Sequence, residues 1–225
     1  MTEANSDEAT GRLWLAETLW KLGGLQFGDF SLGRTVKNSP VYLNAKMLIS
    51  RPDALKRTVA LMSDEVELGM VRRNRTVEPF DGIAGVPIGG LYLATALALR
   101  MDRPLLYVRP PREADEVAAP HIEGIYRPGE RVLVVDDLAT GGGSLVETIV
   151  ALQNAGLMVS DAVVLIDREQ GAARRLEGMG VRLHAILSLE VTLKYLESSG
   201  LINGEDFERA MSYINREGEP RSEFD

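Results

Sequence analysis

Two adjacent carboxylates, followed by a glycine-rich turn, are the residues of this sequence best suited to chemistry. Asp136 and Asp137 end an apolar run within residues 131–144, which read RVLVVDDLATGGGS. Glycines let backbone N–H groups approach an anion closely, and a helix that opens after the turn adds partial positive charge. The carboxylates would repel a phosphate, but they suit the vicinal hydroxyls of a ribose or Mg²⁺ held through water. Thr140 and Ser144 add hydroxyl donors, so the segment predicts a site for a phosphorylated sugar.

A purely structural interpretation of the same segment is a strand–turn–helix junction whose glycines only allow tight packing. The paired carboxylates in front of the turn favour a binding site over that alternative. Two other phosphate-binding patterns do not fit. The first predicted strand is not followed by G-x-G-x-x-G, and no lysine follows the glycines as it does in a P-loop.

Apolar runs typical of strands alternate with helical runs through the middle of the chain. Continuous apolar strands separated by helices predict an α/β fold, with a parallel sheet covered on both faces. Such a sheet binds ligands at the carboxyl ends of its strands, where the two carboxylates lie. The expected strands are 82–86, 105–108, 132–135, 162–166 and 181–187, and the expected helices are 91–100, 145–155 and 172–179.

The chain on either side of this region has a different character. Residues 8–22 predict an amphipathic helix that ends at a Gly-Gly pair, and residues 52–69 predict a second helix with proline at its first position. The stretch between them is rich in Gly, Ser and Asn, so it is expected to be irregular up to a short strand at 41–44. Residues 215–225 are expected to form a polar, solvated tail.

Composition excludes several classes of function. The 225 residues carry 25 Lys and Arg against 33 Asp and Glu, a formal net charge of −8, which argues against nucleic-acid or anionic-membrane partners. The absence of cysteine excludes disulfides, thiolate metal sites and a cysteine nucleophile. No apolar segment approaches the ~18 residues of a membrane span, so a soluble, cytoplasmic protein is expected.

The segment 131–144 resembles the phosphoribosyl-pyrophosphate (PRPP) motif of the type I phosphoribosyltransferases, and further segments resemble the orotate phosphoribosyltransferases among them. The matches are collinear over roughly residues 22–196. They comprise FGDFSL at 27–32 and SPVYLN at 39–44, similar to that family's amino-terminal hood; GVPIGG at 85–90, similar to its pyrophosphate loop; Tyr107–Arg109 and Ile122–Gly124, similar to the strands flanking its mobile catalytic loop; and DREQG at 167–171. The implied organisation is a helix and hood at 1–45, a phosphoribosyltransferase core at 46–214 and the tail at 215–225.

The resemblance implies a reaction, in which orotate displaces pyrophosphate from PRPP to give orotidine 5′-monophosphate with Mg²⁺ as cofactor, and it implies a homodimer. It also implies residue roles. Asp136 and Asp137 would hold the ribose hydroxyls and, through water and PRPP, the metal. The remaining implied residues are Leu138, Ala139, Thr140, Gly141, Gly142, Gly143 and Ser144 for PRPP; Gly85, Val86, Pro87, Ile88 and Gly89 for pyrophosphate; Arg168, Thr140, Tyr42, Leu43 and Arg34 for orotate; and Arg109 and Arg112 for catalysis in the mobile loop.

The mobile loop departs from the family pattern. Family members usually carry Arg-Lys, a further Lys and His-Gly here, whereas this chain has RPPREADEVAAPH at 109–121. Pro110 replaces the first lysine, and Glu113, or Arg112 after a one-residue shift, replaces the second. Two arginines against three acidic residues give the loop a net charge of 2 − 3 = −1, unfavourable over pyrophosphate.

These departures leave two alternative hypotheses open. One is a PRPP- or nucleotide-binding homologue with impaired catalysis, acting as a sensor or partner. The other is a phosphoribosyltransferase for a different base. A second open choice is the basic hood residue that contacts the base, which is either Arg34 or Lys37.

Overall fold

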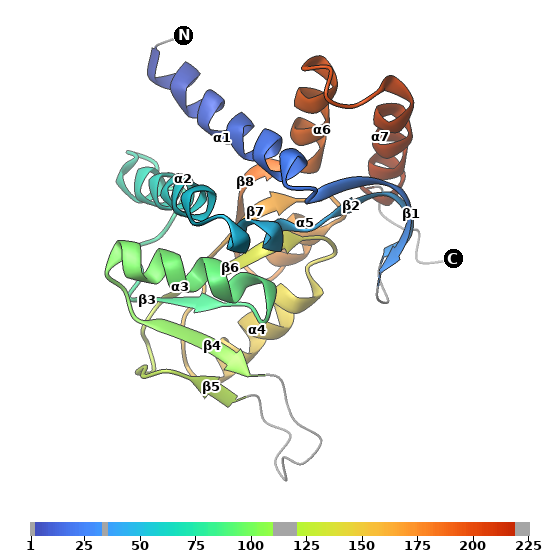
Figure 1. Cartoon of the computed structure of the whole chain (residues 1–225). Coiled ribbons are helices and arrows are strands. Elements are labelled where there is room, and N and C mark those ends of the chain that lie inside the picture. The colour runs from blue at the N-terminus through green and yellow to red at the C-terminus, as the bar shows by residue number, and fades with distance from the viewer. Residues whose placement is uncertain (1–2, 33–35, 110–120, 219–225) are drawn as a thin grey trace.

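A mostly parallel six-stranded sheet forms the centre of the chain, for which a computed structural model describes residues 3–32, 36–109 and 121–218. The strand order is β5-β4-β3-β6-β7-β8, and only β5 runs antiparallel to its neighbour. The strands are β3 (Gly82–Gly85), β4 (Leu105–Arg109), β5 (His121–Glu123), β6 (Val132–Ala139), β7 (Asp161–Asp167) and β8 (Arg182–Ser188). The predicted α/β class and parallel sheet are confirmed (Figure 1).

Helices cover both faces of this sheet, as the continuous burial of its central strands requires. On one face lie α1 (Glu3–Lys21), α2 (Pro52–Val71), α3 (Gly89–Met101) and α6 (Leu189–Ser198), with η1 (Ala45–Ser50) and α7 (Gly204–Gly218) beside them; on the other lie α4 (Gly143–Asn154) and α5 (Ala172–Glu177). No helix in the described ranges is long and apolar enough to cross a membrane.

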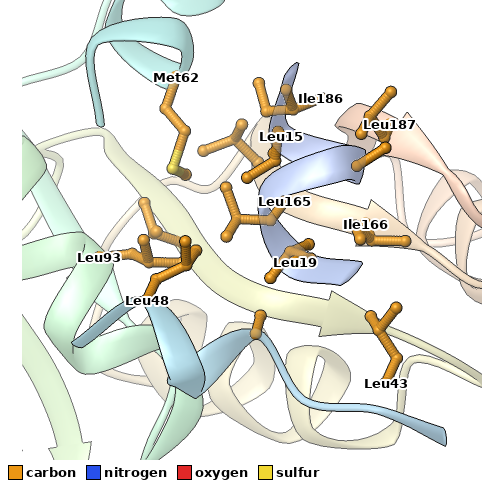
Figure 2. Close-up of a cluster of buried hydrophobic side chains, with 14 of the residues drawn as sticks. Leu15, Leu19, Leu43, Leu48, Met62, Leu93, Leu165, Ile166, Ile186 and Leu187 are labelled. Atoms are coloured by element: carbon orange, nitrogen blue, oxygen red, sulfur yellow. The ribbon is translucent and has the colours of Figure 1, made fainter. Parts of the chain in front are cut away.

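The alternation of side chains along β6 divides the core into two clusters, because successive residues of a strand point to opposite faces. Leu133 and Val135 belong to the larger cluster, with the buried side chains of α1, α2 and α3. Val132 and Val134 belong to the smaller cluster, with α4 and α5. Figure 2 shows leucines of α1 in the larger cluster beside residues of β7 and β8.

The amino-terminal region corrects one expectation. Most of the stretch predicted to be irregular forms a separate antiparallel sheet of β1 (Leu25–Leu32) and β2 (Val36–Leu43), with Leu25 opposite Leu43. Leu25 and Val41 are fully buried, so this small sheet contributes to the core despite its Gly, Ser and Asn content. The polar composition was misleading because packing of a few alternate apolar residues outweighs weak strand propensity.

The carboxyl-terminal end of the chain contains two helices, α6 and α7, that periodicity had not indicated. α7 extends to Gly218, so residues 215–218 of the expected tail continue a helix, and residues 219–225 lie outside the described ranges. Ala210 and Ile214 of α7 are buried in the larger cluster. Figure 1 shows α7 beside the two-stranded sheet, where α7 contacts β2.

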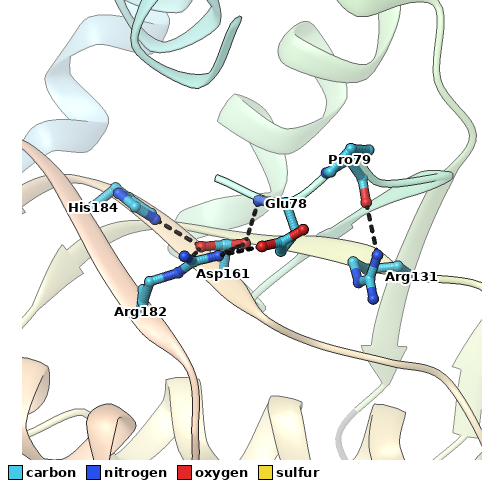
Figure 3. Close-up of polar contacts among 6 residues, drawn as sticks. All are labelled: Glu78, Pro79, Arg131, Asp161, Arg182 and His184. Atoms are coloured by element: carbon cyan, nitrogen blue, oxygen red, sulfur yellow. Dashed lines mark hydrogen bonds and ion pairs between the residues drawn. The ribbon is translucent and has the colours of Figure 1, made fainter. Parts of the chain in front are cut away.

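A buried carboxylate joins the amino-terminal ends of β7 and β8, far along the strands from the predicted site. Asp161 is 3% exposed and accepts hydrogen bonds from Arg182 Nε at 2.9 Å and Nη2 at 3.1 Å, His184 Nε2 at 2.9 Å and the Glu78 backbone N–H at 2.9 Å (Figure 3). Burial raises the pKa of Asp161, but these hydrogen bonds together bring its pKa below the ordinary value of 3.8.

Replacing Asp161 is therefore expected to destabilise the fold. Asp161→Asn should cost about 2 kcal/mol and lower Tm by roughly 4–8 °C at pH 7, because the donors lose a charged acceptor. A folded pKa below the unfolded one gives stability that is present above the unfolded pKa and lost as the pH falls through the folded pKa. The Tm difference should thus shrink below pH 3.8. Thermal melts of the parent and the variant at pH values from about 3 to 8 measure this difference in Tm.

Glu78→Gln provides the matched control, since the Glu78 carboxylate is 39% exposed and approaches Arg182 only at 3.5 Å. Its Tm should change by less than about 2 °C, as for most exposed ion pairs. Equal losses in both variants would contradict the central role of Asp161.

Candidate active site

The two predicted acidic residues lie inside β6 rather than after it. β6 runs through Asp136 and Asp137 to Ala139, and its pairing with β7 continues through Asp136 opposite Val164. The expectation that the strand ends at the carboxylates is therefore wrong, because backbone pairing with β7 extends the strand beyond its apolar run. Since adjacent strand residues face opposite sides, the two carboxylates begin on opposite faces of the sheet.

Asp136 borders a cavity on the face of the sheet covered by α4 and α5. The cavity has a volume of about 220 Å³ and lies where β6 passes through the glycine-rich turn into α4. Its lining consists of Asp136, Leu138, Thr140, Gly141, Gly142, Gly143, Ser144, Leu145 and Arg175. The predicted turn residues thus surround one hollow together with one of the two carboxylates.

The backbone of the turn has the form that an anion site requires. Gly142 has φ +75°, and a Cβ at this position would lie 3.2 Å from Ala172 Cα, so glycine suits both the conformation and the close packing. α4 begins at Gly143 with no side-chain cap. The N–H groups of its first turn therefore keep their capacity to donate to a ligand.

Asp137 faces the other side, where the sequence had indicated no partner. Lys46, on η1, donates to Asp137 Oδ2 at 2.9 Å across 91 residues of sequence. A Cβ on Gly89 would lie 2.4 Å from Asp137 Oδ1, so the start of α3 approaches this carboxylate as closely as only glycine permits. A lone exposed lysine carries no periodic signal, and only the tertiary fold brings it to the acidic pair.

Burial and mutual repulsion act on the carboxylate pair. Asp136 is 7% exposed and Asp137 is 5% exposed. Burial, and then the neighbouring Asp137 carboxylate, raise the pKa of Asp136 well above its ordinary value, while the Asp137 N–H and Lys46 oppose the shift. Burial and both carboxylates also raise the pKa of Tyr92, whose hydroxyl donates to the Ala45 carbonyl at 3.1 Å. The site therefore favours a bound cation or donor beside Asp136.

The predicted pyrophosphate loop connects β3 to α3 next to Asp137. The Gly85–Gly89 segment begins at the last residue of β3 and contains a cis peptide between Pro87 and Ile88. Ile88 is 81% exposed, whereas Val86 is buried. The loop thus lies at the carboxyl edge of the sheet, on the Asp137 side.

Arg168 lies directly after β7 and reaches the two-stranded sheet. Arg168 is 3% exposed, and its guanidinium donates from Nη2 to Ser39 Oγ at 3.1 Å and, more weakly, to the Val41 carbonyl at 3.5 Å. Its Nε has no hydrogen-bond partner among the described residues. Burial lowers the pKa of this guanidinium, so a bound carboxylate would offset an energetic cost already present.

The remaining predicted residues, those for the base and for catalysis in the loop, lie in separate parts of the chain. Tyr42 and Leu43 end β2, where the Tyr42 ring lies 5.4 Å from the Phe30 ring and the Leu43 side chain is buried in the core. Arg109 ends β4, with its Nε 3.6 Å from Glu123 of β5. Arg34 and Arg112 lie outside the described residues.

A mostly parallel α/β sheet with a buried carboxylate pair and a glycine-rich turn at its carboxyl edge has the arrangement in which such folds bind ligands. The family model of the Phosphoribosyl transferase domain matches residues 64–180. An orotate phosphoribosyltransferase of Cenarchaeum symbiosum is 36% identical over 185 residues, which cover 81% of this chain and 88% of that protein. The chain belongs to the phosphoribosyltransferase family.

Two further relatives extend this comparison. The crystal structure of orotate phosphoribosyltransferase from Aeropyrum pernix superposes with a TM-score of 0.69 at 36% identity, covering 84% of this chain and 99% of that one. The uridine 5′-monophosphate synthase of Bos taurus is 35% identical over 200 residues, 89% of this chain. The chain spans 40% of the length of that synthase.

The raised pKa of Asp136 predicts a gain of stability when its charge is removed. Because the folded pKa exceeds the unfolded one, ionisation of Asp136 destabilises the free protein above its unfolded pKa, and the effect vanishes below that pKa. Asp136→Asn should therefore raise Tm by roughly 2–4 °C at pH 7, because it removes a buried charge at a cost of about 1 kcal/mol. Differential scanning calorimetry across pH tests this, since the gain should disappear near pH 3.8.

Asp64→Asn is the control for this experiment, because its carboxylate is 61% exposed and only 3.9 Å from Arg100. Its Tm should hardly change. A gain for Asp136→Asn that persisted unchanged into acid would show that charge burial is not its cause.

Proposed function

We propose that this protein is an orotate phosphoribosyltransferase, which transfers the 5-phosphoribosyl group of PRPP to orotate and releases pyrophosphate. The observation that carries the proposal is that Asp136 lines one cavity together with the glycine-rich turn. The chain that holds this cavity is related to orotate phosphoribosyltransferases along most of its length. Steady-state kinetics with orotate, PRPP and Mg²⁺ test it directly. Absence of pyrophosphate release at saturation would contradict it.

In this proposal the substrate lies across the end of β6. The turn Thr140–Ser144 holds the 5′-phosphate through backbone N–H groups and hydroxyls, and the carboxylates of Asp136 and Asp137 accept hydrogen bonds from the ribose hydroxyls. The Gly85–Gly89 loop, on the Asp137 side, faces the pyrophosphate. The protein forms no covalent bond with the sugar, so its contribution is positioning and electrostatic support of the charges that develop.

Mg²⁺ fits the donor set of this site. The described residues contain no group of three or more His, Cys, Asp or Glu side chains able to hold a metal by themselves. Two adjacent carboxylates with substrate phosphates nearby match the preference of Mg²⁺ for few protein ligands, with waters and phosphate oxygens completing its shell. Asp136 and Asp137 would hold it through water, and bound Mg²⁺ would supply charge neutralisation for the pyrophosphate leaving group.

Arg168 supplies the specificity for orotate in this proposal. A guanidinium fork matches a planar carboxylate, and the buried Arg168 guanidinium still has an Nε without a partner in the described structure. The backbone at Tyr42 and Leu43, at the end of β2, would face the ring. Arg34 or Lys37 is the proposed additional cation of the hood.

A second candidate function is binding of PRPP or a nucleotide without turnover. The loop 109–121, with proline and acidic residues where the family usually has lysines, favours it. Calorimetric binding of PRPP by a protein with no pyrophosphate release would support this candidate over the first.

The proposed homodimer is tested separately by light scattering at the concentrations of the assay.

Arg168 should control recognition of the base carboxylate. Arg168→Gln is expected to raise KM for orotate by about 10- to 100-fold, the loss of one charge-assisted contact, with little change in KM for PRPP. Activity with uracil, which lacks the carboxylate, should not fall in parallel. Initial-rate kinetics with both bases measure this selectivity.

Ser39→Ala is the matched control, because it removes the hydroxyl that accepts from Arg168 while leaving the guanidinium. It should raise KM for orotate by less than about 5-fold. Equal losses in the two variants would mean that Arg168 acts by holding β2 in place.

Restoring basic residues in the loop should increase turnover. Pro110→Lys and Glu113→Lys each add positive charge to the loop that resembles the family's catalytic loop, so each is expected to raise kcat by about 3- to 10-fold, with a further gain in the double variant. Parallel kcat measurements at low and high salt check that the gain is electrostatic. Unchanged rates in all three variants would show that the loop does not limit turnover.

A further inference from the structure

We propose that Arg175, on α5, binds the 5′-phosphate of the substrate in the cavity that Arg175 lines together with the glycine-rich turn. Arg175 lies outside every segment of the family resemblance, and the sequence contained no signal for it. The inference rests on the proposed function and adds to it a residue that recognises the phosphate.

The packing of α5 places Arg175 at the edge of the cavity. The Ala172 N–H donates to the Thr140 carbonyl at 3.1 Å, and Ala172 lies against Gly142, so the start of α5 is fixed to the turn. Arg175 follows Ala172 by three residues and therefore lies on the same side of the helix. Its side chain lines the 220 Å³ cavity together with Asp136 and the turn.

The contact between Arg175 and the turn also orients the backbone. Arg175 Nη1 donates to the Gly141 carbonyl at 3.3 Å. Because the peptide group is planar and trans, fixing this carbonyl also fixes the Gly142 N–H on the opposite side. A guanidinium has five N–H donors, so one bond to the turn leaves donors for a phosphate in the cavity.

Charge makes Arg175 the natural partner of a phosphate here. Among the described residues lining the cavity, Arg175 is the one cation and Asp136 the one anion, and the others are neutral. A phosphate monoester near pH 7 carries between one and two negative charges and would lie close to the Asp136 carboxylate. A guanidinium at the edge of the cavity offsets that repulsion and can donate two parallel hydrogen bonds to two phosphate oxygens.

The neighbouring residue Arg174 provides a matched control. Arg174 has the same charge and is also exposed, but it lines a different hollow, of about 480 Å³, beside Glu177 and Arg182 at the β8 edge. Replacing Arg174 therefore changes the net charge of the protein and of α5 as much as replacing Arg175 does. Only Arg175 borders the cavity of the turn.

Comparing a nucleotide with its nucleoside isolates the phosphate contact. Isothermal titration of orotidine 5′-monophosphate and orotidine gives the factor by which the phosphate tightens binding. In Arg175→Gln this factor should fall by about 10- to 100-fold, with orotidine affinity unchanged. Arg174→Gln should retain the factor of the parent within about 2-fold, and Arg175→Lys, which keeps the charge but not the fork, should be intermediate.

Three results would overturn the inference. If Arg175→Gln keeps the parent's phosphate factor, Arg175 does not bind the phosphate. If Arg175→Gln weakens both ligands equally, Arg175 only supports the turn. A parent protein that binds neither ligand and releases no pyrophosphate contradicts the proposed function and the inference together, whereas an active parent with an unchanged Arg175→Gln factor contradicts the inference alone.

Discussion

Asp136 and Asp137 are neighbours on β6, and burying two carboxylates side by side costs free energy that the surrounding structure must offset. Lys46 offsets part of it by an ion pair with Asp137, and the Asp137 N–H donates to Asp136 Oδ1 at 2.8 Å. The remainder appears as the raised pKa of Asp136. A cation or hydrogen-bond donor beside Asp136 would lower this cost.

The pleat of β6 separates the site into two halves around this pair. Asp136 shares a cavity with the glycine-rich turn and Arg175, and Asp137 contacts Lys46 and the start of α3. Each carboxylate thus has one basic side chain on its own face. This alternation of charge along the carboxyl edge places a basic side chain beside each carboxylate in a chain whose net charge is −8.

The stability of the sheet depends on contacts at the opposite ends of its strands. Asp161 joins β7, β8 and the segment before β3 through hydrogen bonds with Arg182, His184 and Glu78. The amino-terminal ends of the strands are therefore held by a satisfied polar network, which leaves the carboxyl ends free to carry the costly carboxylates. Because the polar network and the buried carboxylates lie at opposite ends of the strands, repulsion between the carboxylates does not disturb the hydrogen bonds that hold the sheet.

The sequence alone determined the parallel α/β sheet, the turn after Asp136 and Asp137, and the position of Arg168 after β7, because each depends on apolar periodicity or on residues close together in the chain. It did not predict the β1–β2 sheet, the extension of β6 to Ala139 or the helix α7, where long-range packing outweighs local composition. Nor did it indicate Lys46 or Arg175, since exposed basic residues have no periodic pattern. Only the tertiary structure decided that Lys46 contacts Asp137 and that Arg175 lines the same cavity as Asp136, because β6 directs neighbouring side chains to opposite faces and the helices that meet each face come from distant parts of the chain.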